Sequence, residues 1–159
     1  KIREETAKLE NELEHARNRM TLGYKKSDGT FCETSSVGLR NVMKTNPDEG
    51  VRKSAYDGLR SIGPFCLEHG FVEIIKKRTK MAKSLGFKDY YDYKVTNAEG
   101  FGKDKLFEIL DTLEKGTRPI LVKARKELED RFGKDALEPW NTGYMTSVCI
   151  FCPEQLLLQ

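Results

Sequence analysis

Apolar residues recur at every third or fourth position along most of the chain, and this period constrains the fold more than any other feature. Over the first twenty residues the repeating positions are Ile2, Thr6, Leu9, Leu13, Ala16 and Met20. Such spacing places side chains on one face of an α-helix, whereas a half-buried strand needs alternate positions. No segment shows that alternation. The sequence therefore predicts an all-α fold, an array of five to seven helices.

Turn and capping residues divide this pattern into separate helices. Ser35 precedes an apolar-periodic segment and Asp48 precedes the next, and both residue types cap helix amino ends. Upstream, Ser27-Asp28-Gly29 has the composition of a turn. Gly63-Pro64 is expected to break or kink a helix, because proline has no backbone N–H to donate. Gly86 is expected to end the helix that follows.

Two expectations concern the segments after Gly86. Residues 87–93 are rich in aromatics, and we expect a short helical turn packed by its rings. A stacking platform for a carbohydrate or nucleotide is the alternative reading of these tyrosines. Further on, a helix containing Leu106 and Leu110 is expected to end at Gly116, and Thr117 and Pro119 are expected to open another.

The charges are nearly balanced, which bears on the partners expected. The chain has 28 basic and 25 acidic residues, a net charge of +3, so no nucleic-acid partner is expected. One segment departs from this balance. Residues 73–94 contain three acids and seven cations: Lys76, Lys77, Arg78, Lys80, Lys83, Lys88 and Lys94. A solvated helix face is one reading of this segment, and an anion-binding patch is the other.

No apolar run approaches the roughly 18 residues that span a bilayer, and the first residues are charged, unlike a signal sequence. The four cysteines are too few and too scattered for a disulfide framework. We therefore expect no membrane association and a reducing, cytoplasmic setting. Because the chain opens at Lys1, we also expect it to be part of a longer product.

From Arg52 to Tyr144, the order of motifs resembles a family of zinc metallopeptidases, the thimet oligopeptidase and oligoendopeptidase F family. Arg52-Lys53-Ser54-Ala55-Tyr56 resembles its R-x-x-A-Y segment. Residues 75–91 are similar to its R-x-x-x-A-x-x-L-G-Y-x-x-Y block, and Pro139-Trp140-Asn141 is similar to its P-W-D turn. Asn141 departs from the family, where an acid is more usual, and so do the Gly63-Pro64 break and everything after Met145.

The resemblance implies the helical part of a neurolysin-like zincin that precedes the catalytic helix. The family binds zinc through the two histidines of H-E-x-x-H and a downstream glutamate. This chain has two histidines, His15 and His69, and neither lies in that motif. No catalytic residue can be carried over, and no cofactor is expected for this chain. We expect a helical domain over residues 1–146, followed by a divergent tail over 147–159.

The cysteines allow one further site. Cys149 and Cys152 form a C-x-x-C pair, which suits a reversible disulfide or half of a zinc site, and Cys66 and His69 form a C-x-x-H pair. Together the four could make a closed zinc site, or they could be ordinary thiols. Three functions stay open: a non-catalytic fragment or short isoform of a metallopeptidase, a helical module that self-associates or holds a protein or peptide, and an enzyme built on the cysteines.

Overall fold

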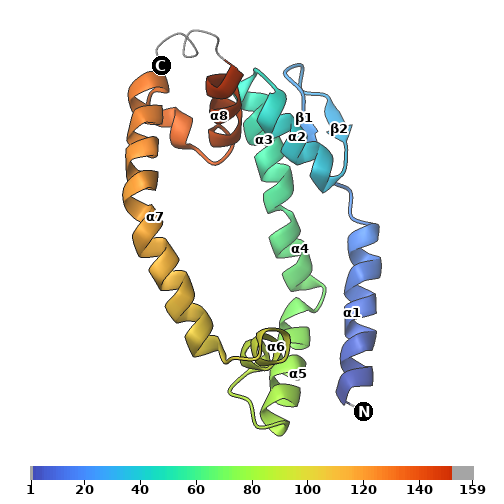
Figure 1. Cartoon of the computed structure of the whole chain (residues 1–159). Coiled ribbons are helices and arrows are strands. Elements are labelled where there is room, and N and C mark those ends of the chain that lie inside the picture. Colours follow the sequence, from blue (N-terminus) through green and yellow to red (C-terminus); the bar gives the residue numbers. More distant parts are fainter. Residues whose placement is uncertain (1, 152–159) are drawn as a thin grey trace. The chain divides into compact units, whose positions relative to one another are not determined.

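The structure is a computed structural model that describes residues 2–151, with side chains for residues 3–147. Its described residues fall into two compact units, and α7 (Lys103–Phe132) runs from one into the other. The first unit contains residues 2–20 and 63–119, and the second contains residues 21–62 and 120–151. Most described residues are helical (Figure 1), which confirms the all-α class.

The first unit is helical throughout its described elements. They are α1 (Ile2–Asn18), α4 (Ile62–Glu68, whose first residue belongs to the second unit), α5 (Phe71–Ser84), α6 (Tyr90–Glu99) and the first part of α7. α1 packs on α5, and α5 packs on α6. Ile74, Ala82 and Val95 are buried, so the core of this unit lies where α5 meets α6 and α1.

Ion pairs join α1 to α5 at the surface of this core. Lys77 Nζ lies 2.8 Å from Glu5 Oε2, and Arg78 Nη2 lies 2.8 Å from Glu10 Oε1. The stripe predicted for the first helix includes Thr6, which is 6% exposed.

The carboxyl end of α5 lies where the sequence predicts it. Gly86, with φ of 88°, follows α5 in the left-handed region and ends it.

The second unit adds a hairpin to helices. Its described elements are β1 (Gly23–Lys25), β2 (Phe31–Glu33), α2 (Ser36–Thr45), α3 (Glu49–Arg60), the second part of α7, η1 (Lys134–Leu137) and α8 (Thr142–Phe151). β1 and β2 are antiparallel and pair Tyr24 with Cys32, and the hairpin lies beside α3 (Figure 1). The expectation of no strand was wrong here, because three-residue strands are too short to show alternation.

Capping side chains fix where α2 and α3 begin, as the sequence predicts. Ser35 Oγ accepts from the N–H of Gly38 at 3.1 Å, and Asp48 Oδ1 accepts from the N–H of Val51 at 3.2 Å. Asp48 Oδ2 also accepts from the Ser27 hydroxyl at 2.6 Å, which ties the hairpin turn to the start of α3. The backbones of β1 and α3 are also close, since a Cβ added to Gly58 would lie 2.3 Å from the Gly23 carbonyl oxygen.

Proline affects the two predicted helix breaks differently. α3 ends at Arg60 and α4 begins at Ile62, so a break precedes Pro64 as expected. The break expected at Gly116 is wrong, because α7 continues through Pro119. Thr117 does not cap a new helix, and its hydroxyl instead donates to the Leu113 carbonyl at 2.8 Å. Residues 87–93 were expected to form a short helical turn, but only residues 90–93 are helical, and they begin the ten-residue helix α6.

Within the described part of the chain, no helix has both the length and the apolar character needed to cross a membrane. Counting α3 and α4 as one helix broken at Ser61, the described residues contain seven α-helices, at the upper end of the predicted range.

Candidate functional site

A buried arginine lies at the centre of the second unit. Arg52, in the first turn of α3, is only 2% exposed. Its Nε and Nη2 donate to Asn141 Oδ1 at 3.0 and 2.7 Å, and its Nη1 donates to the carbonyls of Asn46 and Pro47, each at 2.9 Å. Asn46 is the residue that follows α2. The guanidinium therefore closes the carboxyl end of α2, where a positive charge is favourable.

The side-chain amide of Asn141, which accepts from Arg52, also donates to a carboxylate. Asn141 is fully buried, and its Nδ2 donates to Glu49 Oε1 at 2.9 Å and to the Asp135 carbonyl at 2.8 Å. Trp140 Nε1 donates to the same Glu49 oxygen at 3.1 Å. A neutral amide thus lies between the Arg52 cation and the Glu49 carboxylate, in the place where the resembled family more usually has an acid.

Aromatic rings cover the outside of this network. The Arg52 guanidinium carbon lies 4.3 Å from the centroid of the Tyr144 ring, a cation–π distance. Trp140 packs against Tyr56 with 5.6 Å between ring centroids, and Lys53 Nζ lies 5.1 Å from the Trp140 centroid. We call this set the Arg52 junction: Glu49, Arg52, Tyr56, Trp140, Asn141 and Tyr144.

The electrostatics of the junction favour a structural role over a role in proton transfer. Hydrogen bonds from Trp140 and Asn141, together with the charge of Arg52, hold the pKa of the Glu49 carboxyl below its ordinary value. A carboxylate with a depressed pKa is a poor general base near neutral pH. Among the described side chains, no buried nitrogen or oxygen lacks a hydrogen-bond partner. The buried polar atoms of the junction are therefore all used within the protein.

The two quoted motifs meet at this junction. Arg52 and Tyr56 come from the R-x-x-A-Y segment, and Trp140 and Asn141 come from the P-W-D-like turn 89 positions from Arg52. The sequence interpretation missed Glu49 as a partner, although an acid in the first turn of a helix is a detectable signal. It also missed Tyr144, for which local sequence offers no signal.

The proposed zinc ligands are only partly visible. Cys66 has a free, half-buried thiol. His69 stacks on Phe65 with 3.9 Å between ring centroids, and its Nδ1 lies 2.7 Å from the Phe65 carbonyl oxygen. The side chains of Cys149 and Cys152 lie outside those described, so the four-residue site stays a prediction. Among the described side chains, no three His, Cys, Asp or Glu groups converge on a metal position.

The aromatic segment packs mainly on itself and on α7. Phe87 meets Tyr93 edge to face at 5.2 Å, and Tyr91 approaches Phe107 at 6.1 Å between centroids. These contacts account for two of the three tyrosines in structural terms. Tyr90 differs, because the Arg78 guanidinium lies 5.0 Å from its centroid and both residues line a cavity of the first unit.

Comparison with known protein families places most of this chain in one of them. The sequence model of Peptidase family M3 matches residues 42–149. This span contains every residue of the Arg52 junction and leaves out α1, the hairpin and the start of α2. The searches of curated proteins and of solved structures returned no match.

Proposed function

Because the chain belongs to peptidase family M3, we propose that it is a non-catalytic, helical part of such a peptidase and contributes scaffold to a substrate channel. The membership confirms the resemblance found from Arg52 to Tyr144. One observation carries the proposal of a scaffold: the motif residues Arg52, Trp140 and Asn141 use their polar groups on one another and on Glu49. Residues engaged in this way hold helices in place.

Zinc chemistry has no support from the residues described. The family's metal requires two histidines four residues apart on a helix, and the histidines of this chain, His15 and His69, are 54 positions apart in sequence. The described side chains offer no group of three ligands. We therefore assign no step of peptide hydrolysis to any residue of this chain.

A direct test is an assay with a quenched fluorescent peptide in the presence of zinc. We expect no turnover, and we expect neither zinc nor the peptide to change the unfolding temperature of the chain. Cleavage that a chelator abolishes would overturn the proposal.

A chimera tests the scaffold role itself. Replacing the matching segment of an active M3 peptidase by residues 42–149 should preserve zinc binding and peptide hydrolysis, because the family match spans this segment and every residue of the junction. The matched control carries Arg52→Met in that segment and should lose soluble expression or activity. Equal activity of the two chimeras would show that the junction is not part of the working scaffold.

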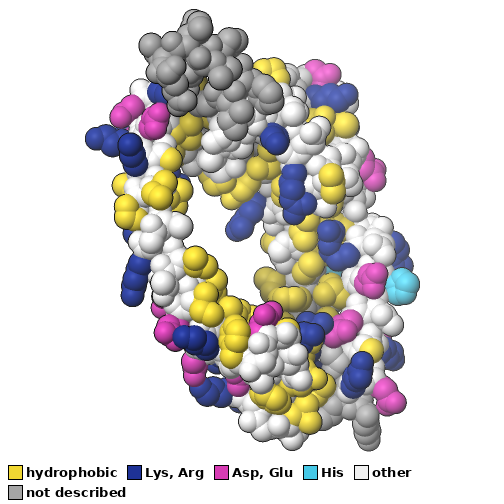
Figure 2. Space-filling model, viewed as in Figure 1, with side chains coloured by type: hydrophobic (Ala, Val, Ile, Leu, Met, Phe, Trp, Pro, Cys, Tyr) yellow, Lys and Arg dark blue, Asp and Glu magenta, His cyan; other side chains and the backbone are white. Residues whose placement is uncertain are grey.

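A second candidate function is a helical module that self-associates or holds a protein or peptide. The observation that favours it is apolar surface left exposed on α7, where Figure 2 shows hydrophobic side chains. Within the second unit, Ile120, Leu121 and Val122 of this helix are 59–71% exposed. Large exposed apolar patches usually mark contacts with other molecules. Light scattering across a concentration series tests self-association, and a strictly monomeric chain would count against it.

The setting is also a proposal. We place the chain in the cytoplasm, without a nucleic-acid partner, because its charges are balanced and its cysteines are few. The described thiols of Cys32 and Cys66 are free. Titration of thiols in protein isolated under alkylating conditions should find both reduced, and a disulfide at either would contradict this location.

A further inference from the structure

A cavity of about 380 Å³ lies in the first unit, apart from the Arg52 junction. Three helices line it: α1 contributes Arg3, Thr6, Ala7 and Glu10, α5 contributes Arg78 and Met81, and α6 contributes Tyr90, Tyr93 and Lys94. The α1 residues lie outside the family-matched span of 42–149. The family match therefore covers the α5 and α6 sides of the cavity and leaves out the α1 side. Its volume lies within the range of small-molecule sites.

The charges around the cavity are unequal. Three cations, Arg3, Arg78 and Lys94, face one acid, Glu10. Arg78 is paired, since its Nε and Nη2 each lie 2.8 Å from Glu10 Oε1. Neither Arg3 nor Lys94 forms an ion pair with any residue in the described part of the chain, so two positive charges remain without a counter-ion.

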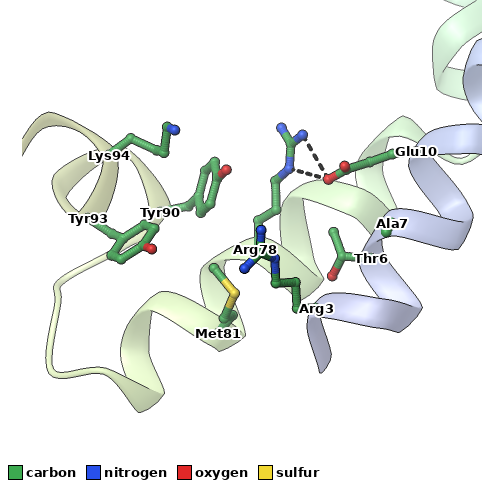
Figure 3. Close-up of a pocket in the computed structure, with 9 residues that line it drawn as sticks. All are labelled: Arg3, Thr6, Ala7, Glu10, Arg78, Met81, Tyr90, Tyr93 and Lys94. Carbon is green, nitrogen blue, oxygen red and sulfur yellow. Dashed lines mark hydrogen bonds and ion pairs between the residues drawn. The ribbon is translucent and has the colours of Figure 1, made fainter. Parts of the chain in front are cut away.

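The side chains converge on a common space. Tyr90 and Lys94 extend from α6 toward Arg78, while Glu10 and Thr6 approach from α1 (Figure 3). The Arg78 Nη1 group makes no hydrogen bond to another described residue, so it keeps donors in addition to those bound by Glu10. Tyr90 and Tyr93, 5.9 Å apart between ring centroids, line the same space with their rings.

We propose that this cavity binds a small phosphomonoester that carries a planar organic group. Two unpaired cations match the two negative charges of a phosphomonoester near neutral pH, whereas a carboxylate would offset only one of them. Arginine and lysine are the usual phosphate ligands of proteins. The tyrosine rings and Met81 provide an apolar wall for the organic group. One of the two readings of residues 73–94, an anion-binding patch, thereby becomes a specific site built on Arg78 and Lys94.

Other cations of that segment do not contribute to the site. Lys76 pairs with Glu73, Lys77 with Glu5, and Lys88 with Asp104. These pairs are on the surface and suit the solvated-face reading. The segment therefore divides into five cations on the surface, of which Lys80 and Lys83 have no ion pair in the described residues, and two that line the cavity, Arg78 and Lys94.

The test is a titration of the whole chain with phenyl phosphate, followed by amide chemical shifts. We expect perturbations at residues of α1, α5 and α6 that line the cavity, and weaker binding as salt rises. Inorganic phosphate, which has no ring, and benzoate, which has one charge, should each bind several-fold more weakly. Equal affinity for either would contradict the proposed ligand class.

Variants localise the binding. Arg3→Met and Lys94→Met should each weaken phenyl phosphate binding by about tenfold, the effect of losing one charge-assisted hydrogen bond. Lys83→Met is the matched control, because it removes the same charge from α5 at an exposed position that does not line the cavity. An equal loss in Lys83→Met, or no perturbation at millimolar phenyl phosphate, would overturn the proposal. These results do not depend on the peptidase assay, so the scaffold proposal can fail while this one holds.

Discussion

Arginine has opposite surroundings in the two units. Arg52 of the second unit is 2% exposed, and its side chain donates four hydrogen bonds within the protein. Arg3 of the first unit is exposed, lines a cavity and has no ion-pair partner in the described chain. The same side chain thus serves structure in one unit and is available to a ligand in the other.

The difference teaches how to separate the two roles in a chain rich in charge. A buried cation must be satisfied internally, because an unpaired charge away from water is costly. An exposed cation costs little by itself and adds little stability. The predictions below test whether stability depends on the first kind of residue and ligand binding on the second.

The largest effect is expected from Arg52→Met. The substitution removes the donors that satisfy Asn141 Oδ1 and the carbonyls of Asn46 and Pro47, so we expect a loss of about 3–5 kcal/mol in the free energy of unfolding. Urea unfolding followed by the fluorescence of Trp140, the sole tryptophan, measures this in the second unit. Arg60→Met is the control, since Arg60 is an exposed arginine at the other end of the same helix. Equal losses in both variants would mean that burial of Arg52 does not matter.

A smaller effect is expected from Asn141→Asp, although it introduces the acid that is more usual in the family. The new carboxylate would face Arg52, but it would lose the amide donor to Glu49 and to the Asp135 carbonyl. We expect a net loss of about 1–3 kcal/mol. Adding Glu49→Gln should recover part of this loss, because the glutamine amide can donate to the new carboxylate. If Asn141→Asp alone left the free energy of unfolding unchanged, the hydrogen bond from Asn141 to Glu49 would not contribute to stability.

Acid should destabilise the second unit by protonating Glu49, and this effect should be smaller than that of Asn141→Asp. The pKa of Glu49 is lower in the folded protein than its ordinary value. Its contribution is therefore present above the unfolded pKa and is lost as pH falls below about 4 toward the folded pKa. Glu49→Gln should flatten this part of the curve of stability against pH. An unchanged curve would remove Glu49 from the account, and wild-type protein unfolded in parallel provides the reference.

The smallest effect is expected from Arg3→Met and Lys94→Met. Neither cation has a partner in the described residues, so each variant should change the free energy of unfolding by no more than about 0.5 kcal/mol. Circular dichroism during urea unfolding provides the measurement. A loss comparable to that of Arg52→Met would break the comparison between the two units.

Local chemistry made much of the fold predictable. Ser35 and Asp48 cap their helices in the structure because a side-chain oxygen needs only the next three residues to find its N–H. Pro119 misled the prediction for an equally physical reason. A proline removes one helical hydrogen bond, but this loss does not end α7, which continues through Pro119 to Phe132.

The sites needed information that local sequence does not contain. Arg52 and Asn141 are 89 positions apart, so only the order of family motifs hinted that they belong together. The cavity of the first unit depends on both α1 and α6 packing on α5, and no spacing in the sequence predicts which faces meet. The cation-rich segment was visible, but its paired and unpaired members were not.

The most direct test of the central claim, that the two family motifs form one structural junction, is a double-mutant cycle. Unfolding free energies of Arg52→Met, Asn141→Ala and the double variant, measured by Trp140 fluorescence, give the coupling energy of the pair. We predict a coupling of at least about 1.5 kcal/mol, as for residues in one buried network. Losses that add to within about 0.5 kcal/mol would show that Arg52 and Asn141 act independently, and would contradict the account.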